Sequence, residues 1–239
     1  MAEKYLGESI KNLGFGLMRL PMKGDEIDME QTKRMVDAFM AKGFTYFDTA
    51  YVYIGGKSEV ALKEAVVDRY PRDSFQCATK LPLWDLKDPG EMEKIFQESL
   101  DRAGLEYYDF YLLHALSAER EKQADELGAW DFMKKLKAEG RAKHIGFSFH
   151  DDFELFEEVL DAADWDFCQI QLNYYDQEFQ AGSRACSLQP SAVLAWSSWN
   201  RCVVDSWSIF RRRFRKCSIR QPTNHQSSWP SIGSGTCPR

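Results

Sequence analysis

Asp48, Tyr53, Lys80 and His114 are of residue types that together can protonate a carbonyl oxygen. A free tyrosine has a pKa near ~10 and is a weak acid at neutral pH. A neighbouring Lys80 ammonium would stabilise the phenolate and lower the pKa of Tyr53, and the Asp48 carboxylate would hold that ammonium in place. His114 would orient the carbonyl oxygen or share the proton. Such a set serves a reaction in which something else, such as hydride, attacks the carbonyl carbon.

Each of these residues also has an ordinary structural explanation when it is taken alone. Asp48 in FDTA could cap a turn, and Tyr53 in YVYIGG could be a loop aromatic. Lys80 could be a solvated charge, and His114 could be a histidine satisfied within the core. The order of the residues and their placement at successive strand ends favour one shared site over separate explanations.

Residues 1–182 alternate between strand and helix patterns. Strands are predicted at 13–21, 44–50, 75–82, 109–115, 144–149 and 167–175. Helices are predicted at 29–42, 58–70, 90–103, 128–139 and 151–163. Asp28 can cap the first of these helices, and Gly43 sits where a C′ residue belongs. These repeats of a strand and a helix, at intervals of roughly 30 residues, imply a parallel sheet with covering helices.

Two architectures fit that alternation, an open doubly wound sheet and a (β/α)₈ barrel. The first strand–helix turn carries Gly14 and Gly16 but no third glycine opening a helix, and no GxxxxGK phosphate loop occurs. A barrel places its active site at the C-terminal ends of the strands. Polar residues gather at those ends, namely Arg19, Asp48, Lys80, His114, Ser148 and Gln169. We therefore predict an α/β fold of the (β/α)₈ TIM-barrel type, incomplete because the head supplies only six of its strands.

Several motifs of the head resemble the aldo-keto reductases over about residues 5–180. They are GFTYFDTAYVYIGGKSE (43–59), ATK (78–80), LEYYDFYLLH (105–114) and GRAKHIGFS (140–148). The resemblance implies a (β/α)₈ barrel that binds NADPH or NADH without a Rossmann fold and reduces a small-molecule carbonyl substrate. The FSFH and QLNYYD segments are most similar to a bacterial or archaeal subgroup that often carries a C-terminal ferredoxin-like cysteine cluster, which this sequence lacks.

The same resemblance implies a role for each site residue. Tyr53 would be the general acid, tuned by Lys80 and Asp48, and His114 would orient the carbonyl. The residues expected to bind the cofactor are Ser148 and Gln169, at the positions that hold the nicotinamide carboxamide, together with Arg19. Phe149 stands where the family usually has an asparagine, which removes one carboxamide contact.

Two further expectations complete the site. Trp84, just past Lys80, is a candidate wall of the substrate pocket, with core packing as the alternative. No metal is expected, because a metal site needs converging ligands and the lysine of the tetrad argues against one.

Composition narrows the class of protein. The six cysteines show no CxxC spacing, which argues against a zinc ribbon, an iron–sulfur cluster or a disulfide scaffold. No apolar run of ~18 residues predicts a membrane span, and the first residues show no signal-peptide pattern. We expect a cytoplasmic enzyme.

Residues 183–239 differ from the head in composition. The head, residues 1–182, has a charge balance of −14, whereas the tail has +8 and a single acidic residue, Asp205. The tail is rich in Ser, Trp and Arg and shows no strand–helix alternation. We predict two parts, a partial aldo-keto reductase barrel over 1–182 and a disordered, non-family tail over 183–239.

Our hypothesis for this tail is a frameshifted reading of the same gene, with the slip near Gly182. When the third base of each codon is read with the first two of the next, permitted codons allow Leu194 to Ser206 to be reread as GLVVMEPLRGGL. That is the kind of strand and loop the family carries next. The last two strands and the cofactor phosphate site would then be missing, leaving sheet edges unpaired and activity impaired.

Two other functions remain open. A non-catalytic barrel could serve as a binding or regulatory module, although the intact tetrad argues against this for the parent gene. The RRRFRK run at 211–216 could bind nucleic acid, but the rest of the sequence adds little support for that reading.

Overall fold

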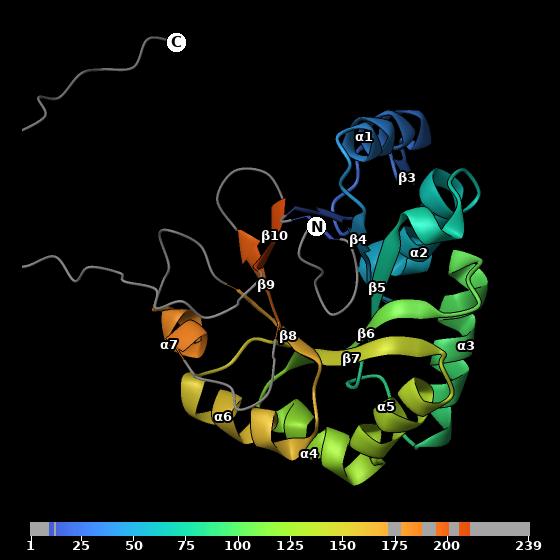
Figure 1. Ribbon diagram of the computed structural model, residues 1–239. Coiled ribbons are helices and arrows are strands. Elements are labelled where there is room, and N and C mark those ends of the chain that lie inside the picture. Colours follow the sequence, from blue (N-terminus) through green and yellow to red (C-terminus); the bar gives the residue numbers. More distant parts are fainter. Residues whose placement is uncertain (1–9, 12, 172–177, 188–194, 201–205, 211–239) are drawn as a thin grey trace, which may run out of the picture.

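The computed structural model describes residues 10–11, 13–171, 178–187, 195–200 and 206–210, the last two ranges as backbone only (Figure 1). Six strands run parallel in one curved sheet, as predicted: β1 (Gly14–Gly16), β4 (Tyr46–Asp48), β5 (Gln76–Leu81), β6 (Tyr108–Leu116), β7 (Ala142–Phe149) and β8 (Phe167–Gln171). The (β/α)₈ pattern predicted for the head is confirmed.

Helices follow the strands and lie on the outside of the curved sheet (Figure 1). They are α1 (Met29–Ala41), α2 (Lys57–Leu62), α3 (Gly90–Ala103), α4 (Ala118–Leu127), α5 (Ala129–Ala138), α6 (Phe153–Ala162) and α7 (Gly182–Ser187). A small hairpin of β2 (Met22–Lys23) and β3 (Glu26–Ile27) precedes α1. Among the described residues, no helix is long and apolar enough to cross a membrane.

The start of α1 shows how the sequence sets a helix boundary. The carboxylate of Asp28 accepts a hydrogen bond from the backbone N–H of Gln31 at 3.0 Å, as an N-cap residue should. The chain leaves the helix through Gly43, whose φ of 73° suits glycine. Val36 and Phe39 lie on the buried face between these ends. The predicted cap and helix are therefore confirmed.

The alternation of side chains along the strands separates two kinds of core. Inside the barrel, a lower layer of Tyr46, Ala78, Phe110, Leu112 and Phe167 forms its own apolar cluster. One pleat further along the same strands, the side chains on that inner face are polar. These are Asp48, Lys80, His114 and Gln169, all of them buried. An apolar floor thus supports a polar layer at the carboxyl end of the barrel.

The outer faces of the strands pack against the helices mainly through aromatic rings. The ring centroid of Phe147 lies 5.8 Å from that of Phe156 in α6 and 5.3 Å from that of Trp165. The ring centroids of Phe149 and Phe156 are 5.2 Å apart. A Cβ at Gly146 would lie only 2.4 Å from the carbonyl oxygen of Phe167, so β7 and β8 approach too closely there for any side chain. The head therefore contains a dense helix–sheet core.

Two strands from the tail complete the ring. β9 (Ala195–Asn200) pairs parallel to β8, and β10 (Ser206–Phe210) pairs antiparallel to both β9 and β1. The strand order around the closed barrel is β1-β10-β9-β8-β7-β6-β5-β4. The edges of β1 and β8, which were expected to stay unpaired, are paired with β10 and β9 in the described residues. Trp, Ile and Phe favour extended backbone, and edge pairing needs no apolar periodicity.

Other differences from the sequence prediction concern boundaries. The first strand is confined to β1, much shorter than the predicted 13–21, and α4 was not predicted at all. Part of the predicted helix at 58–70 is a π-helical turn, Lys63–Val67. The basic run at 211–216 and the rest of the tail after Phe210 lie outside the described residues, so the prediction of disorder there stays a prediction.

Candidate active site

A buried ion pair lies at the centre of the polar layer. The ammonium nitrogen of Lys80 is 2.5 Å from a carboxylate oxygen of Asp48 and 2.7 Å from the carbonyl oxygen of Thr49. The other oxygen of Asp48 accepts a hydrogen bond from the side-chain amide of Gln169 at 3.1 Å. Register explains the convergence. Asp48 is the last residue of β4 and lies opposite Ala78 of β5, two residues before Lys80 on the same face of that strand.

Burial shifts the pKa of both members of this pair. It raises the pKa of Asp48 and lowers the pKa of Lys80, since each charged form is removed from water. Each charge, in turn, stabilises the other, which opposes both shifts. Lys80 thus donates to Asp48 and Thr49, and each carboxylate oxygen of Asp48 accepts a hydrogen bond, in a pair that is buried from water.

Tyr53 lies beside this pair with an unpaired hydroxyl. The Lys80 ammonium nitrogen is 4.9 Å from the centroid of the Tyr53 ring, and the His114 ring centroid is 5.6 Å away in an edge-on arrangement. The tyrosine is buried, and its hydroxyl has no hydrogen-bond partner among the described residues. A group that can donate one proton is therefore placed between a cation and an imidazole.

The predicted direction of the Tyr53 pKa shift is wrong. Burial raises the pKa of Tyr53 well above 10, and the negative charge of Asp48 raises it further. Lys80 fails to lower it because its ammonium is already paired with Asp48 and faces the ring. Tyr53 is consequently a neutral phenol at neutral pH, which is the form a proton donor needs.

The backbone after Tyr53 is strained. Ile54 has φ of 51°, and Gly55 and Gly56 follow with φ of 62° and 86°. A β-branched residue rarely adopts positive φ, and such outliers cost about 1–3 kcal/mol each. A Cβ at Gly56 would lie 2.8 Å from a guanidinium nitrogen of Arg102, so space as well as φ requires glycine there. This left-handed run turns the chain sharply at the tyrosine.

His114 is a neutral imidazole in this site. Burial lowers its pKa well below 6.5, and the charges of Lys80, His150 and Arg120 lower it further. Its Nδ1 has no hydrogen-bond partner among the described residues. A neutral imidazole offers one N–H donor and one acceptor, which suits a group that orients a carbonyl oxygen.

Of the residues expected to contact the cofactor, Ser148 and Gln169 are buried in the barrel and Arg19 is exposed. Ser148 and Gln169 face each other across β7 and β8, and both are buried. The side-chain carbonyl oxygen of Gln169 is unpaired among the described residues, whereas the Ser148 hydroxyl already accepts the N–H of Ala115 at 2.6 Å. Arg19 lies exposed beyond β1. Phe149 packs against Phe156 on the helix side of the sheet.

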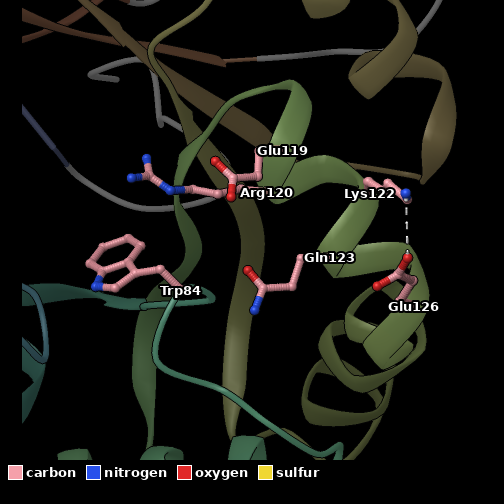
Figure 2. A pocket seen from close by; sticks show the side chains of 6 residues that line it. All are labelled: Trp84, Glu119, Arg120, Lys122, Gln123 and Glu126. Carbon is pink, nitrogen blue, oxygen red and sulfur yellow. Dashed lines mark ion pairs between the residues drawn. The ribbon is translucent and has the colours of Figure 1, made fainter.

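Trp84 lies next to His114, with ring centroids 5.1 Å apart. It lines a pocket of about 380 Å³ together with residues of α4 (Figure 2). The other lining residues are Glu119, Arg120, Lys122, Gln123 and Glu126. The side chain of Trp84 is half-exposed, which agrees with a pocket wall and argues against the alternative of core packing.

Glu59 is an important residue that the sequence analysis missed. It is fully buried and accepts hydrogen bonds from Thr79 at 2.7 Å and from Ser99, while Arg102 lies 3.6 Å away. Burial raises its pKa. The residue joins α2 and α3 to β5 directly behind Lys80. Its position after GGKS, within the quoted motif, was the available signal.

The comparisons with known proteins agree with this fold. A family model described as the aldo/keto reductase family matches residues 12–195. The fold and the matched range together define the class, and this chain belongs to the aldo-keto reductase family. The match extends past residue 182 and ends at the first residue of β9.

Individual relatives are similar at moderate identity. An aldo-keto reductase of Mycobacterium sp. (strain MCS) is 33% identical over 141 residues, which is 59% of this chain and 45% of the relative. A probable aldo-keto reductase 1 of Glycine max is 32% identical over 153 residues, or 59% and 42% of the two chains. The chain therefore spans less than half the length of these curated relatives.

Solved structures support the same fold. An aldo-keto reductase from Klebsiella pneumoniae in complex with NADPH matches with a TM-score of 0.56 and 26% identity, over 72% of this chain and 59% of that one. The holo form of an aldo-keto reductase from Bacillus halodurans matches with a TM-score of 0.57 and 23% identity, over 68% and 53%. The second likeness concerns the fold alone.

Proposed function

We propose that this chain is the catalytic half of an NADPH-dependent carbonyl reductase, with Tyr53 as the proton donor. The observation that carries the proposal is the juxtaposition of two buried polar atoms without a partner among the described residues, the Tyr53 hydroxyl and Nδ1 of His114, beside the Asp48–Lys80 pair. Unpaired buried polar atoms are costly in a folded protein. Their presence side by side supports a site that is completed by a substrate.

The described residues fit the nicotinamide end of a cofactor. Gln169 is held by Asp48 through its amide nitrogen, which leaves its oxygen unpaired to accept an N–H from a carboxamide. Ser148, in register beside it, has spare capacity to accept a further hydrogen bond. When bound, the cofactor supplies the hydride. The relative of known structure was solved with NADPH, so we favour NADPH over NADH.

The roles of the chain's own residues follow from their protonation states. The neutral His114 orients a carbonyl oxygen near the Tyr53 hydroxyl, and the Tyr53 proton passes to that oxygen as its negative charge develops. The phenolate that remains is stabilised by the nearby Lys80 ammonium, which Asp48 keeps in position. The raised pKa of Tyr53 matters here because an alkoxide is a strong enough base to take its proton.

We further propose that residues 183–239 are a shifted reading frame of the parent gene. The antiparallel β10 supports this idea, because a (β/α)₈ barrel consists of parallel strands. The position of β9 beside β8 is where the reread sequence GLVVMEPLRGGL would supply the next parallel strand. Under this proposal the chain as written lacks the phosphate-binding half and binds the nucleotide weakly, as a cytoplasmic product with impaired activity.

The test compares the 239-residue chain with a version whose codons after Gly182 are read in the alternative frame. NADPH binding is measured by quenching of tryptophan fluorescence, and reduction of benzaldehyde is measured by loss of NADPH absorbance. We expect the reframed chain to bind in the micromolar range and to turn over. Failure of the reframed chain to reduce any aldehyde would contradict the proposed function. Micromolar binding by the chain as written would contradict the frameshift.

A further inference from the structure

The most unusual charge outside the tetrad is the guanidinium of Arg120. It is half-buried in the first turn of α4, and its carbon lies 4.7 Å above the ring of Trp84 (Figure 2). One of its N–H groups donates to the carbonyl oxygen of Ala115 at 2.6 Å. Among the described residues no carboxylate forms an ion pair with it, although the head is rich in acids. Its other N–H donors are therefore available.

The position of Arg120 relative to the site is fixed by Trp84 and Ala115. The indole of Trp84 contacts both the guanidinium and the imidazole of His114, whose ring centroid is 5.1 Å from that of Trp84. Ala115 directly follows His114, and its φ of 54° turns the chain so that its carbonyl meets Arg120. The Arg120 guanidinium is thus held in place on the Trp84 indole, which also contacts His114.

The residues that line this pocket include two cations, Arg120 and Lys122, and two carboxylates, Glu119 and Glu126, and Arg120 is the cation that lies against Trp84. Lys80, His150 and Arg120 all act on His114 as positive charges. Lys122 of the same pocket is already paired with Glu126 at 3.9 Å, farther along α4 (Figure 2). A planar guanidinium with free N–H groups recognises a carboxylate through two parallel hydrogen bonds. A pocket of about 380 Å³ accommodates a ligand the size of a substituted benzene.

We infer that Arg120 is a specificity-determining residue that binds a carboxylate carried by the carbonyl substrate. The substrate class is therefore small aldehydes or ketones that bear a carboxylate about one aromatic ring away from the carbonyl. Trp84 packs against the body of the molecule between the two groups. This inference rests on the proposed function for the identity of the reacting end, but the recognition itself is a binding event.

The test uses binding to the full 239-residue chain, so that it does not depend on turnover. The probes are 4-(hydroxymethyl)benzoate, the alcohol that reduction of 4-carboxybenzaldehyde would give, and 4-methylbenzyl alcohol as its uncharged counterpart, both titrated calorimetrically. We expect the carboxylate to bind at least about tenfold more tightly than the neutral alcohol. Arg120→Gln should abolish that preference without changing the weak binding of the neutral alcohol. Arg120→Lys should restore part of it, because the charge returns without the planar fork.

Lys122→Gln is the matched control, since it removes the same charge from the same helix and pocket but should leave both affinities within about twofold. Equal binding of the two probes by the wild-type chain, or a preference that survives Arg120→Gln, would overturn the inference. Circular dichroism of each variant establishes that it is folded. Reduction of benzaldehyde without any carboxylate preference would leave the proposed function standing alone. Carboxylate binding without reduction of any aldehyde would support the role of Arg120 and contradict the proposed function.

Discussion

The two halves of the barrel are built on different principles. From β4 to β8, every strand has a parallel neighbour on each side and outer faces that pack against helices through aromatic rings. The other side of the ring consists of the short β1 and the tail strands β9 and β10, of which β10 runs antiparallel. In the described part of this side, α7 precedes β9 and packs on α6, where Arg184 lies 4.0 Å from the Phe153 ring. Phe15 of β1 packs against Phe39 of α1 with ring centroids 5.5 Å apart, and β9 and β10 pair with their neighbours through the backbone.

The candidate catalytic residues all belong to the half that packs against helices. Asp48, Tyr53, Lys80 and His114 all come from the first half, and their buried contacts need nothing from the tail. Under the frameshift proposal, the part of the barrel expected to bind the far end of the nucleotide is missing. The proposed proton-donating centre is therefore assembled from the first half alone.

The largest expected effect concerns that centre. Tyr53→Phe removes only the hydroxyl, so the rate of carbonyl reduction in the reframed chain should fall by ~10²–10⁴ while NADPH affinity stays nearly unchanged. Tyr51→Phe is the matched control, because its hydroxyl bonds to Glu98 at 2.9 Å outside the site and its loss should leave the rate within about twofold. Turnover of Tyr53→Phe at the wild-type rate would remove tyrosine from the mechanism.

The second prediction compares how much a proline substitution lowers the free energy of unfolding in each half of the barrel. Leu112→Pro breaks the ladder of β6, where Leu112 lies between Lys80 and Gly146, and should lower the free energy of unfolding by about 3 kcal/mol or more. Ser198→Pro breaks the ladder of β9 between Ile170 and Ser208 and should cost less than about 1 kcal/mol, because the stable core lies elsewhere. Urea denaturation followed by circular dichroism gives both values. Equal losses would show that the closing half stabilises the fold as much as the first.

The smallest effect is a pH dependence of stability that originates in the first half. In the folded chain the pKa of His114 lies well below its usual 6.5. As the pH falls below 6.5, this histidine is therefore protonated in the unfolded chain but stays neutral in the folded chain. The free energy of unfolding should then decrease by about 1 kcal/mol per pH unit over that range.

His114→Gln isolates this contribution. The pKa of Asp48 and Glu59 is raised by burial, so these carboxyls stabilise the fold as the medium becomes acidic and partly mask the histidine. They are common to both proteins and cancel in the difference. Urea midpoints measured between pH 7 and 5 should decline less steeply for the variant, and parallel declines would mean that His114 is not buried as a neutral group.

Sequence patterns predicted the first half well because its residues obey simple rules. The Asp28 cap, the periodic apolar faces and the polar residues at strand ends each depend on local spacing, and the structure confirms the strands and most of the helices they predicted. The four site residues could be named because each ends a strand or follows one, and parallel strands bring such ends together.

The misses have equally specific causes. α4 has few apolar residues, so its sequence lacks the periodicity that reveals a helix. β9 and β10 are stabilised by pairing with distant strands, which no local pattern in AWSSWN or SWSIF indicates. The direction of the Tyr53 pKa shift depends on burial and on Lys80 being already engaged with Asp48, and spacing along the chain carries neither fact.

The left-handed turn at Ile54 has a consequence for anyone who tries to evolve or engineer this chain. Ile54→Gly would relieve a strained backbone and should raise the thermal midpoint of unfolding, because a φ of 51° is unfavourable for a β-branched residue. The same change would give more conformational freedom to the residue next to Tyr53, so the rate of carbonyl reduction proposed for the reframed chain should fall. Ile54 thus holds an unfavourable backbone conformation directly beside Tyr53, where glycine would leave the chain less restricted.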